Sequence, residues 1–279
     1  MKTLRLTCIL ELLLIFVCAP YAGGYEDGHP DPSMGPRAEG EERPSASGDL
    51  GFLSKYIWRG FELSDDSIVV QPSATVRYRG FSMNIWGNLD LDFEDMDPAT
   101  TDKKEWTETD LTLSYETEFG PFGISGGYIY YAMDGIDDSE ELFLSLSLDV
   151  LLSPSLTVYR EISHLPGWYV NLGISHSFEL SNGWSLDLEA GGGYYYSDDE
   201  AFVEVDDLGN GTAEKYRNFH NGLVSATLNI PAGRYFTIAP MVAYSFPLSD
   251  QADNLLTAAG FSNDSDFIYG GVNFSISFP

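Results

Sequence analysis

The sequence predicts an all-β chain that folds as a transmembrane, antiparallel, up-and-down β-barrel of about 12 strands. Three observations predict it. Apolar and polar residues alternate in short segments, the connections alternate between tight and long, and no stretch after the N-terminal segment could form a membrane-spanning helix. A barrel strand has one face toward lipid and one toward the interior, so its signal in the sequence is this alternation.

The alternation is clear in residues 81–94, where Phe81, Met83 and Ile85 alternate with Ser82 and Asn84. Segments of this kind have about the length, roughly 9–11 residues, that a tilted strand needs to cross the hydrocarbon layer. The segments lie near the following residues: Leu50, Ile68, Phe81, Thr107, Phe122, Leu142, Pro154, Gly167, Trp184, Asn221, Thr237 and Ile268. Alternation would also fit a soluble β-sandwich, so it does not decide the fold class alone.

The lengths of the connections favour the barrel. Every second connection is tight: Arg79-Gly80, Gly120-Pro121, Leu152-Ser153, 181–183 and 231–233. The connections between them are mostly longer and acidic: 62–67, 95–105, 134–139, 163–166, 198–218 and 247–266. Short turns at one end and long loops at the other are typical of outer-membrane barrels, and an even strand count returns both chain ends to the periplasm.

Aromatic residues near the segment ends predict interfacial girdles: Trp58, Trp168, Trp184, Tyr194, Tyr196, Phe219 and Phe246. The alternative is that they form a protein core. Pro72 and Pro240 fall in the middle of segments, where each removes a ladder hydrogen bond. We therefore expect a bulge or locally frayed pairing at each of these two prolines.

The chain divides into three parts. Lys2 and Arg5 precede an apolar run over 9–17, which predicts a signal peptide over residues 1–24 and export to the bacterial outer membrane. Residues 25–48 are rich in proline and charge and predict a flexible periplasmic linker, and residues 49–279 form the barrel. Both cysteines lie in the signal peptide, so we expect a mature chain without disulfides or thiolate sites.

The net charge limits the partners. The chain has 43 acidic residues against 14 Lys and Arg, for a net charge of -29. Nucleic acid is excluded as a partner, because binding phosphates requires basic patches. The expected partners are outer-membrane lipid, lipopolysaccharide and small polar solutes or cations, and both a monomer and an oligomer remain open.

Charged residues on the polar faces predict the lining of a lumen. If the apolar faces lie against lipid, the residues that face inward are Lys55, Arg59, Arg77, Asp90, Asp92, Asp110, Glu116 and Glu118. Register counted from the turns places Asp90 beside Asp110 and Arg59 one strand beyond Asp92, with Arg77 and Glu116 nearer the periplasm. Two interpretations stay open, an eyelet that selects solutes by charge and a salt-bridge network that fills a narrow lumen.

The long connections carry many acids, including Asp95, Asp97, Asp102, Glu105, Asp137, Asp138, Asp198, Asp199, Asp206, Asp207, Asp250, Asp253, Asp264 and Asp266. An acidic mouth would attract cations, and its oxygens could hold Ca²⁺ or Mg²⁺ that bridges lipopolysaccharide phosphates. None of these runs has the spacing of a calcium loop, and simple solvated loops are the other interpretation. We predict no metal site and no cofactor.

Signals for an enzyme are weak. Outer-membrane phospholipases place a nucleophilic serine and a histidine on one strand face. Here Ser175, His176 and Ser177 put the serines on the face opposite the histidine. The sequence also lacks a His/Cys metal set and a glycine-rich phosphate loop. We predict that the chain is not an enzyme.

The region Ser54–Phe93 carries Ser54-x-Tyr56-x-x-Arg59-Gly60, followed by Gln71, Trp86, Asp90 and Asp92. With these features, the chain resembles the start of the TorF-like porins of bacterial outer membranes. Glu108-x-Asp110 and Gly127-Tyr128-x-Tyr130-Tyr131 are similar to the middle part of that family, so the resemblance covers about residues 49–180. It implies a barrel and a pore, and it implies no substrate and no catalytic residue.

Together these features predict an outer-membrane channel for passive diffusion of small polar solutes or ions, preferring cations through its acidic mouth and charged lumen. The alternative is a structural or adhesive barrel whose lumen is closed by its own charge pairs and which transports nothing.

Overall fold

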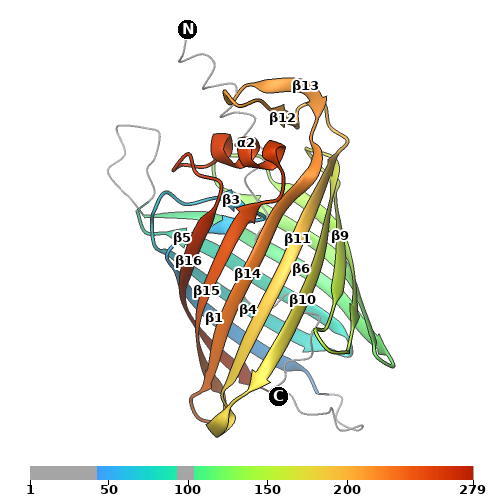
Figure 1. Ribbon diagram of the computed structural model, residues 1–279. Coiled ribbons are helices and arrows are strands. Elements are labelled where there is room, and N and C mark those ends of the chain that lie inside the picture. The colour runs from blue at the N-terminus through green and yellow to red at the C-terminus, as the bar shows by residue number, and fades with distance from the viewer. Residues whose placement is uncertain (1–42, 93–103, 279) are drawn as a thin grey trace.

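The computed structural model describes residues 43–92 and 104–278, and these form one closed antiparallel barrel (Figure 1). The predicted count of 12 strands is confirmed. The barrel strands are β1 (Ser45–Leu53), β4 (Val69–Tyr78), β5 (Phe81–Asp90), β6 (Glu105–Phe119), β7 (Phe122–Met133), β8 (Ser139–Leu148), β9 (Ser155–Glu161), β10 (Gly167–Glu179), β11 (Ser185–Ser197), β14 (Arg217–Pro231), β15 (Phe236–Pro247) and β16 (Phe267–Phe278). Consecutive barrel strands are neighbours, and β1 pairs with both β4 and β16 to close the wall.

The first strand begins at Ser45, inside the range 25–48 that the sequence analysis assigns to a linker. Ala46 and Gly48 pair there with β16 on one side and β4 on the other, so these small residues already belong to the wall. The predicted signal peptide and residues 25–42 lie outside the described residues.

The remaining elements lie in the connections. The long connections hold β2 (Ile57–Trp58), β3 (Phe61–Glu62), β12 (Val203–Val205), β13 (Gly211–Lys215) and helix α2 (Asp250–Ala259), whereas a short one holds the 3-10 turn η1 (Ser181–Gly183). Figure 1 shows β3, β12, β13 and α2 gathered at one end of the barrel, which we name the loop end, and the short connections at the other, the turn end. The predicted alternation of tight and long connections therefore corresponds to the two ends of one barrel.

Within the described residues, no helix combines the length and the apolar character that a membrane crossing requires.

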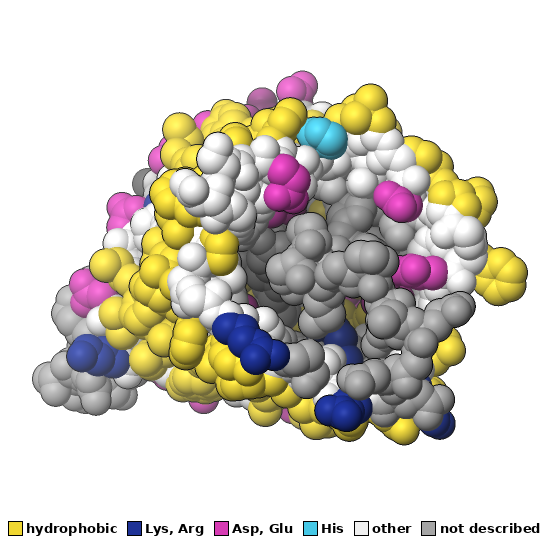
Figure 2. All heavy atoms as spheres, turned by 90° about the horizontal axis from the view of Figure 1, so that it is seen from below, with side chains coloured by type: hydrophobic (Ala, Val, Ile, Leu, Met, Phe, Trp, Pro, Cys, Tyr) yellow, Lys and Arg dark blue, Asp and Glu magenta, His cyan; other side chains and the backbone are white. Residues whose placement is uncertain are grey.

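The outside of the barrel is apolar. On β8, Leu142, Leu144 and Leu146 are about half exposed, whereas the neighbouring Glu141 points inward and is buried. Figure 2, a view from the turn end, shows hydrophobic side chains around the outer wall. A soluble protein rarely exposes an apolar surface of this extent, and a closed barrel leaves no unpaired strand edge in the lipid. The chain is therefore an outer-membrane β-barrel.

Most of the predicted girdle residues lie on this outer surface. Trp168, Tyr196 and Phe219 are exposed toward the loop end, and Trp184 is exposed at the start of β11 near the turn end. Trp58 is a correction, because it is buried inside the barrel. The chain turns inward after β1, so Trp58 lies on β2 and not on a wall strand.

The two mid-strand prolines interrupt the ladder as expected, by local fraying without a bulge. Pairing of β4 with β5 lapses across residues 71–72 beside Pro72, and pairing of β14 with β15 lapses across 239–240 beside Pro240. The register is the same on both sides of each gap. Each proline lacks an N–H, so the missing pairing falls where the donor is absent.

Candidate functional site

The connection between β1 and β4 folds into the barrel. Strands β2 and β3 pair with each other as a separate two-stranded sheet, with Trp58 opposite Phe61. Arg59 (φ 45) and Gly60 (φ 88) both have positive φ, the backbone of a two-residue hairpin turn that twists with its strands. We name residues 55–66 the inward hairpin.

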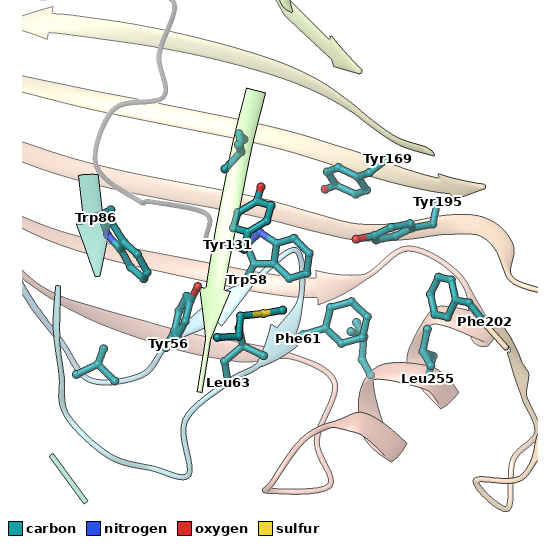
Figure 3. Close-up of a cluster of buried hydrophobic side chains, with 14 of the residues drawn as sticks. Tyr56, Trp58, Phe61, Leu63, Trp86, Tyr131, Tyr169, Tyr195, Phe202 and Leu255 are labelled. Atoms are coloured by element: carbon teal, nitrogen blue, oxygen red, sulfur yellow. The ribbon is translucent and has the colours of Figure 1, made fainter. Parts of the chain in front are cut away.

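The inward hairpin fills the loop-end half of the lumen. Figure 3 shows side chains from the hairpin, the wall strands, the β11–β14 connection and helix α2 meeting in one cluster. The cluster contains Tyr56, Trp58, Phe61, Leu63, Trp86, Tyr131, Tyr169, Tyr195, Phe202 and Leu255, all buried. This is a protein core inside a barrel. Strand β7 is apolar on both faces because one face meets lipid, whereas the other contributes Ile129, Tyr131 and Met133 to this core.

Arg59, at the tip of the hairpin, makes the central polar contact. Its guanidinium donates from Nη1 to Oε1 of Glu141 (2.9 Å) and from Nη2 to Oε2 (2.8 Å), and Nη1 also donates to the Tyr195 hydroxyl (3.1 Å). Both side chains of the ion pair are almost fully buried. The Tyr131 hydroxyl donates to the same carboxylate at 2.9 Å. A buried ion pair requires this kind of complete hydrogen bonding to offset the loss of hydration.

Aromatic rings surround the same guanidinium. Its central carbon lies 4.2 Å from the ring centre of Tyr169, 4.4 Å from that of Trp58 and 4.5 Å from that of Tyr159. The negative face of an aromatic ring attracts a cation, more strongly where water is excluded. Arg59 is thus held by one carboxylate and several ring faces at once.

Two further acids hold the body of the hairpin. The Tyr56 hydroxyl donates to Oε2 of Glu108 on the wall at 3.0 Å. Glu62 accepts from Lys55 Nζ at 2.7 Å, and from the backbone N–H (2.8 Å) and hydroxyl (2.7 Å) of Ser262 in the β15–β16 connection. The hairpin is therefore tied by side chains to β6, β8 and the last long connection.

The predicted residue Lys55 lies at the base of the hairpin, where it pairs with Glu62 and Asp66. Burial opposes its charged form, but the hydrogen bonds and negative charges of Asp66 and Glu62 outweigh burial and raise the pKa of Lys55. Lys55 thus belongs to the attachment of the hairpin rather than to an open wall.

The predicted neighbours Asp90 and Asp110 both point inward and are buried, but they are not opposite each other. Asp90 is opposite Glu105, and Asp110 is opposite Trp86. The cause is the stagger of the two strands, since Phe81 lies opposite Tyr115. Strands β5 and β6 are joined by a long connection, so counting from the tight turns does not fix their stagger.

The predicted placement of Arg59 one strand beyond Asp92 is also wrong. Asp92 is exposed just past the end of β5, and its backbone N–H donates to Oδ1 of Asp90 at 3.0 Å. Arg59 lies in the lumen against Glu141 on β8 because the hairpin carries it away from the wall.

The remaining predicted charges lie toward the turn end. Arg77 on β4 and Glu118 on β6 are exposed, and Glu116 on β6 is partly exposed. Strand β5 separates Arg77 from Glu116. They face the turn-end half of the lumen and lie apart from the buried charges at the hairpin.

The turn-end half of the lumen is lined by hydroxyls and amides. Ser82 bonds Ser114 and Ser145 bonds Thr157, each at 2.8 Å between oxygens, across neighbouring strands. Carboxylates join this lining, since Asn229 donates to Asp187 at 2.5 Å and Ser225 to Glu189 at 3.4 Å. Side chains here bond one another in a polar wall, in contrast to the packed loop end.

The acidic loops bring no metal site into view. No group of three or more His, Cys, Asp or Glu in residues 43–92 and 104–278 could hold a metal ion. Asp95, Asp97 and Asp102 fall outside those ranges. Asp206 has a local role, because it accepts the backbone N–H groups of Asn210 (2.8 Å) and Leu208 (3.0 Å), which lowers the pKa of Asp206.

The Ser175-His176-Ser177 segment lies on β10 as the alternation predicts. Ser177 donates to Asp187 inside the barrel at 2.6 Å, whereas His176 packs edge-on against Phe178, with 4.5 Å between ring centres. The serine and histidine side chains therefore diverge, which does not suit nucleophilic catalysis.

Sequence reasoning did not single out the partners of Arg59, namely Glu141, Tyr131, Tyr159, Tyr169 and Tyr195. Each lies on the inward face of its strand, but the alternation could not assign Tyr131, because its segment is apolar on both faces. The charge of Glu141 on the inward face of its strand could have marked it as a candidate lumen residue. The sequence could not show that Arg59 is the partner of Glu141, because Arg59 comes from a connection and not from an adjacent strand.

No family model matches the chain, and no curated protein matches it. The similarity to the TorF-like porins therefore stays a prediction.

Solved structures of outer-membrane barrels are similar to it in fold. A structure described as KdgM porin is 13% identical with a TM-score of 0.49 and covers 84% of this chain and 99% of that one. NanC porin is 8% identical with a TM-score of 0.49 and the same coverage. The translocator domain of the autotransporter NalP from Neisseria meningitidis is 10% identical with a TM-score of 0.42, covering 87% and 90%. Identities and scores this low carry no functional argument, so function is argued below from this chain's own residues.

Proposed function

We propose that the chain is a porin-like channel of the outer membrane that passes small polar solutes and prefers cations, and that the inward hairpin closes it in this conformation. The observation that carries the proposal is the lining of the turn-end half, where hydroxyls, amides and carboxylates face a lumen rather than a packed core. A polar interior is what a water-filled channel requires, although plugged barrels have one too, so conductance is the deciding measurement.

The preference for cations rests on the charges of that lining. Four acids face the lumen there, namely Asp49, Glu116, Asp187 and Glu189. Among the described residues of that half, the basic side chain that faces inward is Arg77. Rings of carboxylates favour cations in pores, and a low-dielectric wall strengthens their field. At the level of the hairpin, the acids Asp90, Glu108 and Asp110 are also buried inside the barrel, and Glu108 bonds Tyr56.

The hairpin is built so that it could move without breaking the wall. Strands β2 and β3 pair only with each other, and the wall closes through β1 and β4 on either side of them. Withdrawal of the hairpin would break side-chain contacts at Glu108, Glu141 and Ser262, whereas the barrel ladder would stay intact.

The rival function is a structural or adhesive barrel that transports nothing. The buried Arg59–Glu141 pair and the packed aromatic cluster favour it, because they fill the loop-end half of the lumen. The two functions differ in one respect that can be measured, whether ions ever pass.

Planar-bilayer recording of the refolded full chain distinguishes them. We expect intermittent conductance from the wild type, larger steady conductance when a short Gly-Ser linker replaces residues 55–66, and a reversal potential in a KCl gradient that indicates cation preference. Asp187→Asn combined with Glu189→Gln should reduce that preference. The matched control is Asp206→Asn, in a loop outside the lumen, which should leave the preference unchanged. If neither the wild type nor the linker variant conducted ions, the structural barrel would be established instead.

A further inference from the structure

Apart from Trp58, the residues that surround the Arg59 guanidinium belong to the wall and not to the hairpin. Tyr131, Glu141, Tyr159, Tyr169 and Tyr195 come from β7, β8, β9, β10 and β11, one residue from each of five neighbouring strands. Tyr159 is directly opposite Tyr169 in the ladder, and Tyr169 is directly opposite Tyr195. We name these five residues the wall cage.

The wall cage is held in place without Arg59. The Tyr169 hydroxyl donates to the side-chain oxygen of Asn221 at 2.8 Å, and the Tyr131 hydroxyl donates to Glu141 at 2.9 Å. The rings of Tyr169 and Tyr195 pack with centres 4.8 Å apart. Each of these contacts joins wall residues, so withdrawal of the hairpin would leave the carboxylate and the ring faces in position.

The chemistry of the wall cage is specific for a planar cation. Glu141 receives two parallel N–H bonds from one guanidinium, a geometry that an ammonium group cannot reproduce. Ring faces of Tyr159 and Tyr169 lie 4.5 and 4.2 Å from the guanidinium carbon. Proteins commonly bind a guanidinium group with a carboxylate that accepts two N–H bonds and with aromatic rings that stack on its faces.

A pocket leads to this place. It is small, and Glu141, Tyr169 and Tyr195 form part of its lining. Asp137 and His164 of two long connections line it as well, so it borders the loop end. The wall cage therefore lies beside a small opening toward the loop end, and its full occupation requires withdrawal of the hairpin.

We propose that the wall cage is a binding site for solutes that carry a guanidinium group, and that Arg59 occupies it as a built-in ligand. The inward hairpin and the solute then compete for Glu141, so the solute favours the withdrawn hairpin. This inference rests on the proposed channel function for its biological use, but the binding itself does not require conduction.

Calorimetric titration of the full chain in detergent micelles with methylguanidinium chloride tests the site, with NaCl at the same ionic strength as the blank. Arg59→Ala vacates the wall cage and should bind the probe at least about tenfold more tightly than the wild type, because Arg59 occupies the site in nearly all wild-type molecules. Arg59→Ala combined with Glu141→Gln should lose that binding. Methylammonium chloride should bind Arg59→Ala more weakly than methylguanidinium.

The matched control is Arg160→Ala. Arg160 also pairs with a carboxylate, that of Asp198 at 2.5 Å, and also lies over an aromatic ring, that of Trp168 at 4.9 Å, but it is partly exposed on the outer wall. Its removal should leave titration as in the wild type. The proposal would be overturned if Arg160→Ala and Arg59→Ala increased the affinity for methylguanidinium equally. It would also be overturned if Arg59→Ala bound methylguanidinium and methylammonium with equal affinity.

A second measurement covers the case in which Arg59→Ala does not fold. In the wild type, methylguanidinium should speed hydrogen exchange of the amides in residues 56–62, whereas equal NaCl should not, and unchanged exchange would overturn competition with Arg59. Binding without conduction would leave the site in place and refute the channel. Conduction without binding would refute only the site.

Discussion

At the scale of single residues, Gly60 shows how closely the inward hairpin is fitted. Its φ of 88 lies in the left-handed region, and a Cβ placed there would come 2.9 Å from Cβ of Asn221 and 3.0 Å from Cδ1 of Leu256. The turn is therefore pressed against β14 and helix α2, and a side chain at this position meets both a backbone strain and a steric clash.

Gly60→Ala should loosen the hairpin by more than the strain of a left-handed alanine, which costs about 1–2 kcal/mol. Hydrogen exchange of residues 55–66, followed by mass spectrometry, should rise. Gly233→Ala is the matched control, because Gly233 has a φ of 90 and nothing within 4 Å of its Cβ position, so it carries the backbone strain alone. If the two variants changed their own turns equally, packing against Asn221 and Leu256 would not be what holds the hairpin.

At the scale of elements, helix α2 acts as a cover over the inward hairpin. Ser249 caps its N-terminus by accepting the backbone N–H of Ala252 at 3.1 Å, and Asp250 and Asp253 lie in the first turn, where the helix dipole favours negative charge. Its buried side chains include Leu255 and Leu256, which face the aromatic cluster. The helix thus joins the last long connection to the first.

Leu256→Ala should detach this cover. Truncation of a buried leucine typically costs about 2–5 kcal/mol. That loss should appear as faster exchange in α2 and in residues 55–66, because the wall strands are held by their own ladder. Leu208→Ala removes the same atoms at a position that is 85% exposed and should change neither region. Faster exchange throughout the wall would mean that α2 and the hairpin stabilise the barrel as a whole.

At the scale of the whole molecule, the barrel places apolar residues outside and polar residues inside, the reverse of a soluble protein. Its apolar rows lie outside and its hydroxyl rows inside. Within residues 43–92 and 104–278, the apolar core around the inward hairpin has no counterpart in the turn-end half of the lumen. Membrane insertion is what makes such an arrangement stable, because lipid removes the outer rows from water and the closed ladder pairs the backbone.

Leu144→Arg tests this arrangement. Leu144 is 52% exposed near the middle of β8, and an arginine on the lipid face near the bilayer midplane costs about 2–4 kcal/mol. Denaturant unfolding of the chain refolded in vesicles should show a loss of that size. Leu208→Arg, in a loop, should show little change. Equal small effects would contradict the placement of β8 in the membrane.

The barrel was predictable because its determinants are local. Alternation with period two assigns each side chain of β8 or β16 to one face, and a two-residue turn such as Arg79-Gly80 joins neighbouring strands. The prolines were predictable too, because a missing N–H interrupts pairing wherever it falls. The lumen side of Asp90 and Asp110 followed from the same parity.

The sequence by itself determined the strands, their count, the faces that meet lipid and the end that carries the loops. Only the tertiary structure decided that the first long connection folds inward, that Trp58 lies in a core rather than a girdle, and that Arg59 binds Glu141. The physical reason is that strand pairing follows from neighbours along the chain. The partner of a side chain inside the lumen depends instead on which distant segments share the enclosed space, and closure of the barrel sets that space.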